Sequence, residues 1–354
     1  MKKILSLILM TFVIIGVSTL KGYAKEDAAK IEMLPVFSAQ TDAQNRLWVG
    51  TFQIVWNEFM DNILKGPVLF KNYESELATQ LNKQEFKKSM ISEDSYYTAY
   101  GETTLALKEQ IEKAIMEKFN ETSDVLDKID WTDPNNAYLL YAMLKKDFTY
   151  SARFEILPAE KFNNSKTQYK YFGINEKSRP EQYSSVKVLF YNNPFDYAVA
   201  LQGNNDEVIL YRTNSDKTFK NLYADLTKKT EKYRGNRAFV QGDKLKIPFI
   251  SVKQDIDYQA LCGHEILNTD RLYIGKALNT VDFNMNNTGV KLKSEAAMSI
   301  MTMSLLPEMK KQRGRNFYFN NTFALFLKEK DKSMPYYAMR VKDLELYKYT
   351  GEIH

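Results

Sequence analysis

Cysteine and histidine are scarce in this chain of 354 residues. Its single cysteine is Cys262, so no disulfide can form within the chain and stability must come from packing. The two histidines are His264 and His354, and they exclude a metal centre built from several imidazoles.

The short motifs of common enzyme classes are also missing. The sequence contains no glycine-rich phosphate loop and no GxSxG turn. The run from Cys262 to Glu265 places a thiol near His264, but a cysteine and a histidine two residues apart need not face each other, and no local signature supports a nucleophile. We therefore expect a packing role for this run, and a protein that is not an enzyme and uses no metal or cofactor.

The N-terminus has the pattern of an export signal. Lys2 and Lys3 precede an apolar run over residues 4–17, and Gly22 and Ala24 are the small residues of a cleavage site. The apolar run is shorter than the roughly 20 residues of a membrane-spanning helix. We predict a signal peptide over residues 1–24 and a mature domain over 25–354, secreted or located in the periplasm, with no membrane contact after cleavage; an uncleaved anchor is the alternative. Cleavage removes three lysines and lowers the formal net charge from +5 to +2, which says little about partners.

The remaining composition, 44% hydrophobic and 26% charged, is that of a globular protein with a large core. Apolar residues at steps of three and four predict helices over residues 47–63, 74–88 and 103–119. A continuous apolar run over 138–144 predicts a buried strand, and from residue 186 onward alternating patterns and polar turns predict mainly β-structure. There we expect strands near 186–190, 197–201, 208–211 and 245–253, and a helix over 219–226.

The C-terminal quarter contains two predicted strands with a weakly anchored segment between them. Val281, Phe283 and Met285 alternate with polar residues as in a half-buried strand. Phe323 to Leu327 is apolar on both faces, which is typical of a buried strand. The segment between them has no comparable anchor.

These residues resemble the serpin family of protease inhibitors. LYIGKALNTVDFNMNNTG, ending at Gly289, is similar to the serpin pattern LYxxKxxxxxxxxxN that leads into the hinge glycine, and FNNTFALFLKEKDKSMPYYAMRV is similar to the C-terminal signature FNxPFxFxI with its last strand. A looser similarity covers residues 138–154, where Phe154 matches the end of NAIYFKGxWxxxF while Tyr150 and Ala142 replace the tryptophan and the asparagine. Residues 255–263, DIDYQALCG, resemble the helix that serpins place before the next pair of strands, which implies a helix there.

The resemblance implies an α+β fold, with helices packed on large, mainly antiparallel sheets and an exposed reactive-centre-type loop from Val290 to about Asn316. It implies a suicide-substrate inhibitor of serine proteases. Counting from the glycine places the scissile bond at Met303-Ser304, which suggests chymotrypsin-, elastase- or subtilisin-like partners. The hinge that would enter the central sheet after cleavage comprises Gly289, Val290, Lys291, Leu292, Lys293, Ser294, Glu295, Ala296 and Ala297.

The hinge sequence gives mixed indications about insertion. In an extended strand, the hinge residues that point to the same face as Val290 carry no charge, whereas Lys291, Lys293 and Glu295 point to the opposite face. The hinge pattern therefore predicts that insertion buries no ion. Inhibitory hinges are small throughout, however, and Leu292 occupies a position usually filled by alanine. Residues 291–301 also fit a helical stripe.

A basic run lies in an insertion relative to the serpin pattern. It could contact a polyanion or another partner, although such runs are usually solvated loops. Its members are Lys310, Lys311, Arg313 and Arg315.

We therefore expect an exported, monomeric serpin-like protein, in the first place an inhibitor of serine proteases. The alternative is a non-inhibitory serpin-fold protein whose loop or basic insertion binds a partner. A third reading is an unrelated exported α+β protein, which would lack a large central sheet.

Overall fold

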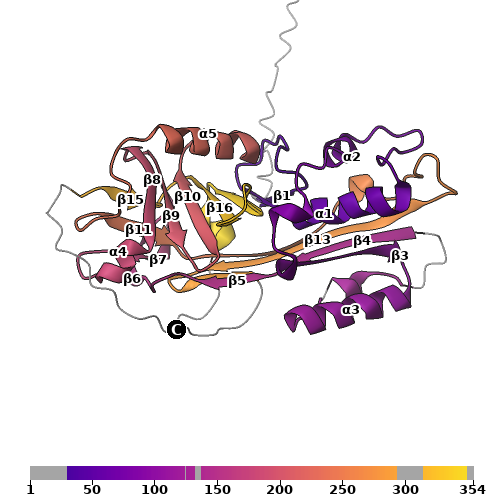
Figure 1. The fold of residues 1–354 in the computed structure, drawn as a ribbon, viewed down its shortest axis with the longest axis horizontal. Coiled ribbons are helices and arrows are strands. Elements are labelled where there is room, and N and C mark those ends of the chain that lie inside the picture. Colours follow the sequence, from indigo (N-terminus) through magenta and orange to yellow (C-terminus); the bar gives the residue numbers. More distant parts are fainter. Residues whose placement is uncertain (1–29, 124, 132–136, 293–313, 349–354) are drawn as a thin grey trace, which may run out of the picture.

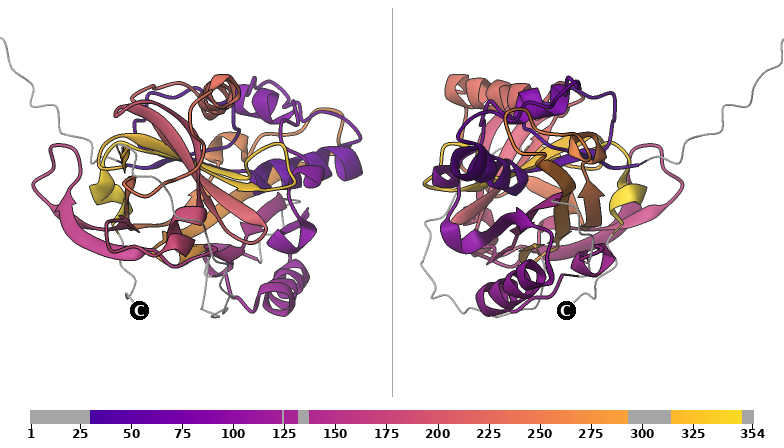
Figure 2. Two further views of the ribbon diagram at one scale, coloured as in Figure 1. Left: turned by 60° about the vertical axis from the view of Figure 1, so that its left-hand side comes forward. Right: turned by 90° about the vertical axis from the view of Figure 1, so that its right-hand side faces the viewer.

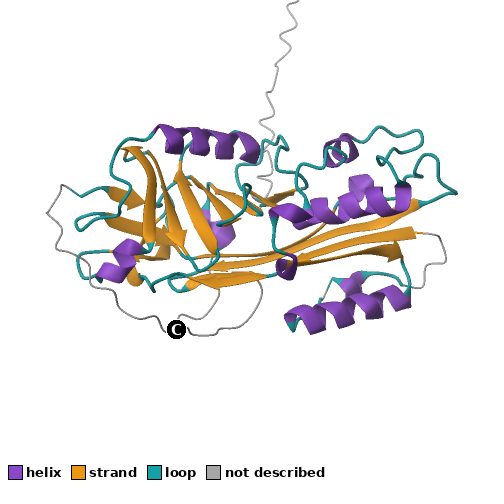
Figure 3. Ribbon diagram, in the orientation of Figure 1, coloured by secondary structure: helices purple, strands orange, loops and turns teal. Residues whose placement is uncertain are grey.

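The computed structural model describes residues 30–123, 125–131, 137–292 and 314–348. This part of the chain forms three sheets with helices on their outer faces (Figure 1, Figure 3). None of its helices is long and apolar enough to span a membrane.

The seven-stranded sheet contains the C-terminal strands in its middle. Its order is β1-β2-β17-β16-β10-β9-β8, and all pairs except β1–β2 are antiparallel. The strands are β1 (Glu32–Leu34), β2 (Arg46–Val49), β17 (Tyr337–Val341), β16 (Phe323–Glu329), β10 (Asp206–Arg212), β9 (Asp196–Gln202) and β8 (Val186–Asn193).

The six-stranded sheet is long and carries the hinge. Its order is β3-β4-β13-β14-β5, with β12 pairing β13 beside this path. The strands are β3 (Tyr96–Glu102), β4 (Ala137–Leu144), β13 (Tyr273–Met285), β14 (Gly289–Leu292), β5 (Lys146–Thr149) and β12 (Ile250–Asp257). A four-stranded sheet completes the β-structure, in the order β15 (Asn316–Tyr318), β11 (Lys244–Pro248), β7 (Gln168–Ile174) and β6 (Glu155–Lys161).

Helices cover both faces of the six-stranded sheet (Figure 1, Figure 2). On one face lies α1 (Thr51–Glu58), which continues as a π-helical turn, η1 (Phe59–Leu64), with α2 (Glu76–Leu81) beside it. On the other face α3 (Leu105–Phe119) buries Leu107, Ile111, Ile115 and Phe119 in a separate apolar cluster. The remaining helices are α4 (Pro180–Ser184), α5 (Phe219–Lys232) and the short 3-10 turns η2 (Lys88–Met90), η3 (Glu93–Ser95), η4 (Leu126–Lys128), η5 (Gln259–Leu261) and η6 (Leu344–Tyr347).

Two of the predicted helices are shorter in the structure. The helix expected from residue 47 begins at Thr51, because Trp48 lies in β2 and pairs with Ala338 of β17. The helix expected over 74–88 is only α2, because Gln84 has a left-handed backbone (φ 51°) and Asn82 bonds to Val68 of the preceding loop. Tertiary pairing overrides helical spacing in both places.

Two predictions in the second half are also wrong. The single strand expected near 245–253 is two strands in different sheets, since β11 ends at Pro248, which has no N–H to donate, and β12 starts at Ile250. The helix expected over 255–263 is the end of β12 followed by η5. The helices predicted over 103–119 and 219–226 and the strands near 138–144, 186–190, 197–201 and 208–211 are confirmed as α3, α5, β4, β8, β9 and β10.

Candidate functional site

The hinge of the predicted loop forms a hairpin with the end of β13. Asn286 makes the turn, since its side-chain oxygen accepts the backbone N–H groups of Thr288 (2.8 Å) and Gly289 (3.2 Å), and its own N–H donates to Gly289 O (3.0 Å). β14 then runs antiparallel to β13, with Val290 opposite Met285 and Leu292 opposite Phe283.

Gly289 is required at its position by a close approach of two strands. A Cβ atom there would lie 2.1 Å from the carbonyl oxygen of Phe148 and 2.9 Å from Thr149 Cα. Only a residue without a side chain allows β14 to pair with β5 at this distance. The glycine taken as a hinge from the sequence therefore has a direct steric role.

β14 separates two strands that otherwise form one continuous surface. Over Tyr273 to Thr280, β13 pairs in parallel with β4, and we call this pairing the seam. Beyond Thr280, β13 pairs instead with β14, which pairs on its other side with β5, the continuation of β4. We call the point of divergence, between Thr280 and Phe283 on β13, the fork.

The predicted exposed loop must therefore be corrected at its start. Residues 289–292 form a strand inside the sheet, and Val290 is only 1% exposed. Backbone pairing on both sides stabilises an extended chain here, so the helical alternative is wrong for Lys291 and Leu292. The predicted alternation of inward and outward side chains holds for the described residues, because Val290 joins the main core while Lys291 remains partly exposed.

The remaining residues of the predicted hinge and the scissile bond lie outside the described residues. They are Lys293, Ser294, Glu295, Ala296, Ala297, Met303 and Ser304. The same is true of Lys310, Lys311 and Arg313 of the basic run and of the signal peptide.

Arg315 is described, and its guanidinium is held inside the protein. It donates to Asp243 Oδ2 (2.6 Å) and to the carbonyl oxygens of Asn236 (2.6 Å) and Ala238 (2.7 Å). Burial opposes its charged form, but the bonds to Asp243 outweigh this effect and raise the pKa of Arg315. Arg315 thus anchors the start of β15 with its guanidinium engaged inside the protein, and the polyanion contact of the basic run stays a prediction.

The run around Cys262 has the packing role expected from the sequence. Burial, reinforced by Asp257, raises the pKa of the Cys262 thiol to about 12, which keeps it protonated and poorly nucleophilic. The His264 ring stacks on Tyr73 with 3.8 Å between centroids. In the described part of the chain, no group of three or more acidic, histidine or cysteine side chains is placed to hold a metal ion.

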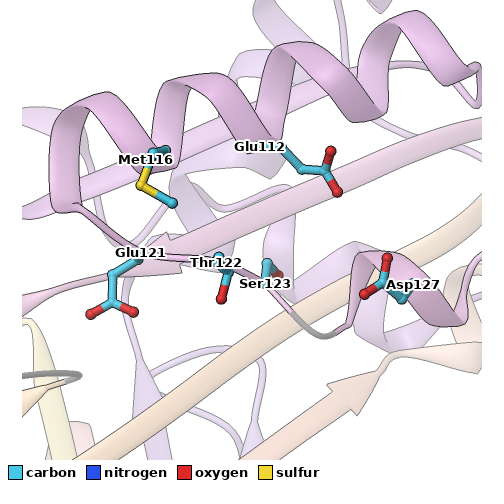
Figure 4. A pocket seen from close by; sticks show the side chains of 6 residues that line it. All are labelled: Glu112, Met116, Glu121, Thr122, Ser123 and Asp127. Carbon is cyan, nitrogen blue, oxygen red and sulfur yellow. The ribbon is translucent and has the colours of Figure 1, made fainter.

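A pocket of about 470 Å³ lies between α3 and the loop that follows it (Figure 4). Glu112 and Met116 project from the helix, and the other lining residues, Glu121, Thr122, Ser123 and Asp127, come from the loop and η4. With three carboxylates around it, this pocket does not suit a polyanion.

Sequence reasoning missed the fork and the side chains around it. Asn279 is 1% exposed on β13, yet neither atom of its amide makes a well-formed hydrogen bond among the described residues, although the Tyr258 hydroxyl lies near it. Lys145 and Lys146 lie where β4 passes into β5. Two lysines directly after a buried apolar run were the only available signal, and that signal is weak.

Comparison by sequence finds no relative, since no family model and no curated protein matches the chain. Comparison by structure finds several similar proteins. A serpin of the trematode Schistosoma haematobium matches over 87% of this chain and 96% of its own, with a TM-score of 0.51 and 12% identity. The mouse protein Z-dependent protease inhibitor matches over 85% of this chain and 91% of its own, with a TM-score of 0.52 and 11% identity. The chain has the serpin fold. Human thyroxine-binding globulin, bound to thyroxine, is a more distant match, with a TM-score of 0.46 over 83% of this chain and 98% of its own and 9% identity.

The serpin fold confirms the α+β class predicted from the C-terminal quarter and excludes an unrelated α+β architecture. In this serpin fold β14 lies between the two strands that diverge at the fork, and it leads into residues 293–313. The structural matches establish the fold, and identities near 12% leave the activity to be argued from the residues.

Proposed function

We propose that the protein is an exported inhibitor of serine proteases that acts as a suicide substrate. The single observation that carries the proposal is the position of β14 between β13 and β5. An inhibitor of this kind needs a place in its sheet that can accept the cleaved loop as a further strand. Here the first four residues of that strand are already in place.

The register of β14 defines where further residues would go. If the same pairing continued, residue 296 would lie between Ala142 and Asn279, and residue 298 between Leu140 and Ala277. These are two pairs that now face each other across the seam. The added strand would thus open the seam pair by pair without any shift of β4 against β13.

The side chains at these positions fit such an insertion. The side chains that now line the seam at these positions are buried in the main core and are at most 1% exposed; they are Ala142, Asn279, Leu140 and Ala277. The residues of Val290 parity that would join them carry no charge, and each charged residue of the hinge falls on the other face. Insertion would therefore place no ion in the main core, where an unpaired charge would cost several kcal/mol. On the opposite face Glu295 would lie beside Met143, under α3.

The chemistry implied by the serpin resemblance begins at Met303. The protease serine would attack the Met303 carbonyl carbon, the Met303–Ser304 peptide bond would break, and Ser304 would leave as an amine carrying the proton. Met303 would remain joined to the protease as an ester. Insertion of residues 293–303 would have to outpace hydrolysis of this ester.

Trapping of a protease tests the proposal. Mature protein (residues 25–354) is incubated with chymotrypsin, elastase and subtilisin, and the products are boiled in detergent. We expect a covalent complex with at least one of these proteases and a loss of its activity. Clean cleavage with full protease activity would reject the proposal.

Two substitutions of opposite parity provide a control for insertion. Ala296→Asp introduces a negative charge on the face that would enter the main core, whereas Lys291→Asp introduces it on the opposite face, where Lys291 is partly exposed. We expect Ala296→Asp to abolish the covalent complex while still being cleaved, and Lys291→Asp to retain it. Equal trapping by both variants would contradict the register.

The binding-protein alternative makes a different prediction for the same material. If the loop were only a contact surface, cleavage between residues 293 and 313 would leave the melting temperature unchanged. A rise on cleavage would support insertion, because the new strand would add backbone pairing and buried apolar surface.

A further inference from the structure

Two consecutive lysines occupy the fork of the six-stranded sheet. β4 ends at Leu144 and β5 begins at Lys146, and Lys145 joins them. Because successive residues of an extended chain point to opposite faces, the two side chains leave the sheet in opposite directions. Both are largely buried, with 18% of the Lys145 side chain and 12% of the Lys146 side chain exposed.

Lys146 fastens the fork to the seven-stranded sheet. Its Nζ lies 2.6 Å from Glu329 of β16 and 3.2 Å from Asp206 of β10, and it donates to Ser95 Oγ (3.0 Å). Glu329 also accepts hydrogen bonds from Ser92 N and Oγ. Both carboxylates are at most 5% exposed, so Lys146 is the cation on which two buried anions depend.

Lys145 fastens the same point to α3 on the opposite face. Its Nζ donates a 2.6 Å hydrogen bond to the carbonyl oxygen of Phe119, the last residue of α3, and lies 3.3 Å from Glu121. A cation at a helix C-terminus also interacts favourably with the helix dipole. Since α3 packs on Leu139, Tyr141 and Met143 of β4, this contact connects the helix to the strand at the end of the seam.

We propose that Lys145 and Lys146 are positioning residues that clamp the fork from both faces and keep β4 paired with β13, an inference that rests on the proposed function for its biological role. Further pairing beyond Leu292 requires β4 to move away from β13. That movement would pull Lys146 from Glu329 and Asp206, or else carry part of the seven-stranded sheet along. On the other face it would pull Lys145 from the end of α3. The clamp keeps the seam closed until the gain from strand addition exceeds this loss.

Hydrogen exchange in the intact, uncleaved protein tests the clamp. The variants are Lys145→Met and the triple variant K146M/D206N/E329Q, which removes the tether without leaving a buried charge unpaired. Lys246→Met is the control, since Lys246 has a similar exposure (14%) and one ion pair, to Glu160, but lies on β11 in the four-stranded sheet. Circular dichroism confirms that each variant folds, and the triple variant carries the test alone if Lys145→Met does not.

We expect amide exchange at the fork to be about tenfold faster in the clamp variants, through local opening of the seam. The affected amides are those of Ala142 to Leu144 and Leu278 to Phe283. The amides of β9 in the clamp variants, and the fork amides in the Lys246→Met variant, should exchange at the rates of the unmodified protein. Unchanged exchange at the fork, or an equal rise in every sheet, would overturn the clamp.

The outcome is separable from that of the proposed function. Faster exchange at the fork in a protein that never traps a protease would support the clamp and reject suicide inhibition. Protease trapping by the unmodified protein, with unchanged fork exchange in the variants, would support inhibition and reject the clamp.

Discussion

The middle strands of the two large sheets are built differently. In the seven-stranded sheet, β16 pairs antiparallel on both sides, and residues 323–327 are fully buried and all apolar. In the six-stranded sheet, β13 pairs in parallel with β4 through an irregularity between Ile274 and Lys276, carries the buried Asn279, and then diverges at the fork. Parallel pairing is slightly weaker per residue, and a buried amide that lacks well-formed hydrogen bonds costs free energy. The first sheet is a continuous core, which we call the permanent core, whereas the second contains the seam that would open in the proposed mechanism.

The largest expected effect lies in the permanent core. Phe326→Ala in β16 removes a fully buried ring that packs edge-on against Phe219 and Tyr223. We expect a loss of about 3–5 kcal/mol in the free energy of unfolding, measured by urea denaturation. A loss below about 1 kcal/mol would show that this sheet is no more tightly packed than the seam.

The next largest effect concerns Glu329, which connects the two sheets through Lys146. Burial opposes its ionisation, but hydrogen bonds from Lys146 and Ser92 outweigh burial and lower the pKa of Glu329 below its ordinary value of 4.5. A lowered pKa stabilises the fold above the ordinary value, and this contribution disappears as the pH falls through the lowered one. Glu329→Gln should cost about 2–3 kcal/mol at neutral pH.

The pH profile of stability gives the control for Glu329. The difference between the unmodified protein and Glu329→Gln should shrink as the pH falls from 4.5 through the lowered pKa of Glu329, because below that pKa Glu329 is neutral in both the folded and the unfolded protein. Urea denaturation at several pH values measures this difference in the free energy of unfolding. A difference that stays constant with pH would assign the loss to altered packing.

A smaller effect is expected at a pair of arginines within the seven-stranded sheet. Arg46 and Arg340 are direct cross-strand neighbours, both buried, and they share one carboxylate, Asp216. Asp216 is 37% exposed, so solvent screens part of the interaction. Asp216→Asn should lower stability by about 1–2 kcal/mol in urea denaturation, whereas Asp331→Asn at an exposed ion pair should change it by less than about 0.5 kcal/mol. Equal losses of stability in the two variants would mean that Arg46 and Arg340 can lie side by side without a shared carboxylate.

The smallest effect should have the opposite sign. Asn279→Leu replaces an amide that lacks well-formed hydrogen bonds with an apolar side chain of similar size. We expect a gain of about 1 kcal/mol in the free energy of unfolding, which would make the seam more like the permanent core. The gain should come with slower insertion after loop cleavage, followed by the rise in melting temperature with time. A loss of stability would show that the amide is satisfied in solution.

Patterns along the chain predicted the elements whose environment is uniform. Helix α3 was predictable from its helical period, and strands β4 and β16 from apolar runs that are buried on both faces. The serpin fold itself was predictable from the residues around Gly289 and in β16, since these have fixed spacings along the chain. The ends of α1 and α2 were not, because Trp48 and Asn82 are engaged by distant strands and loops.

The fork could not have been predicted from local patterns. Whether Val290 lies in a loop or in a strand depends on β5, which is distant along the chain and contributes only four residues. The alternation of Val290 and Lys291 was visible and correct, but the same alternation suits an exposed hinge and an inserted one. Likewise, Arg315 looked like part of a basic run, and only the fold places Asp243 beside it.

The strands that follow residue 313 have a consequence for any cut between residues 293 and 313. The released C-terminal piece would contain β16 and β17, which lie in the middle of the seven-stranded sheet, and β15, which Arg315 fixes to the four-stranded sheet. A nicked molecule would therefore stay together as one particle in native buffer and separate into two polypeptides only when denatured.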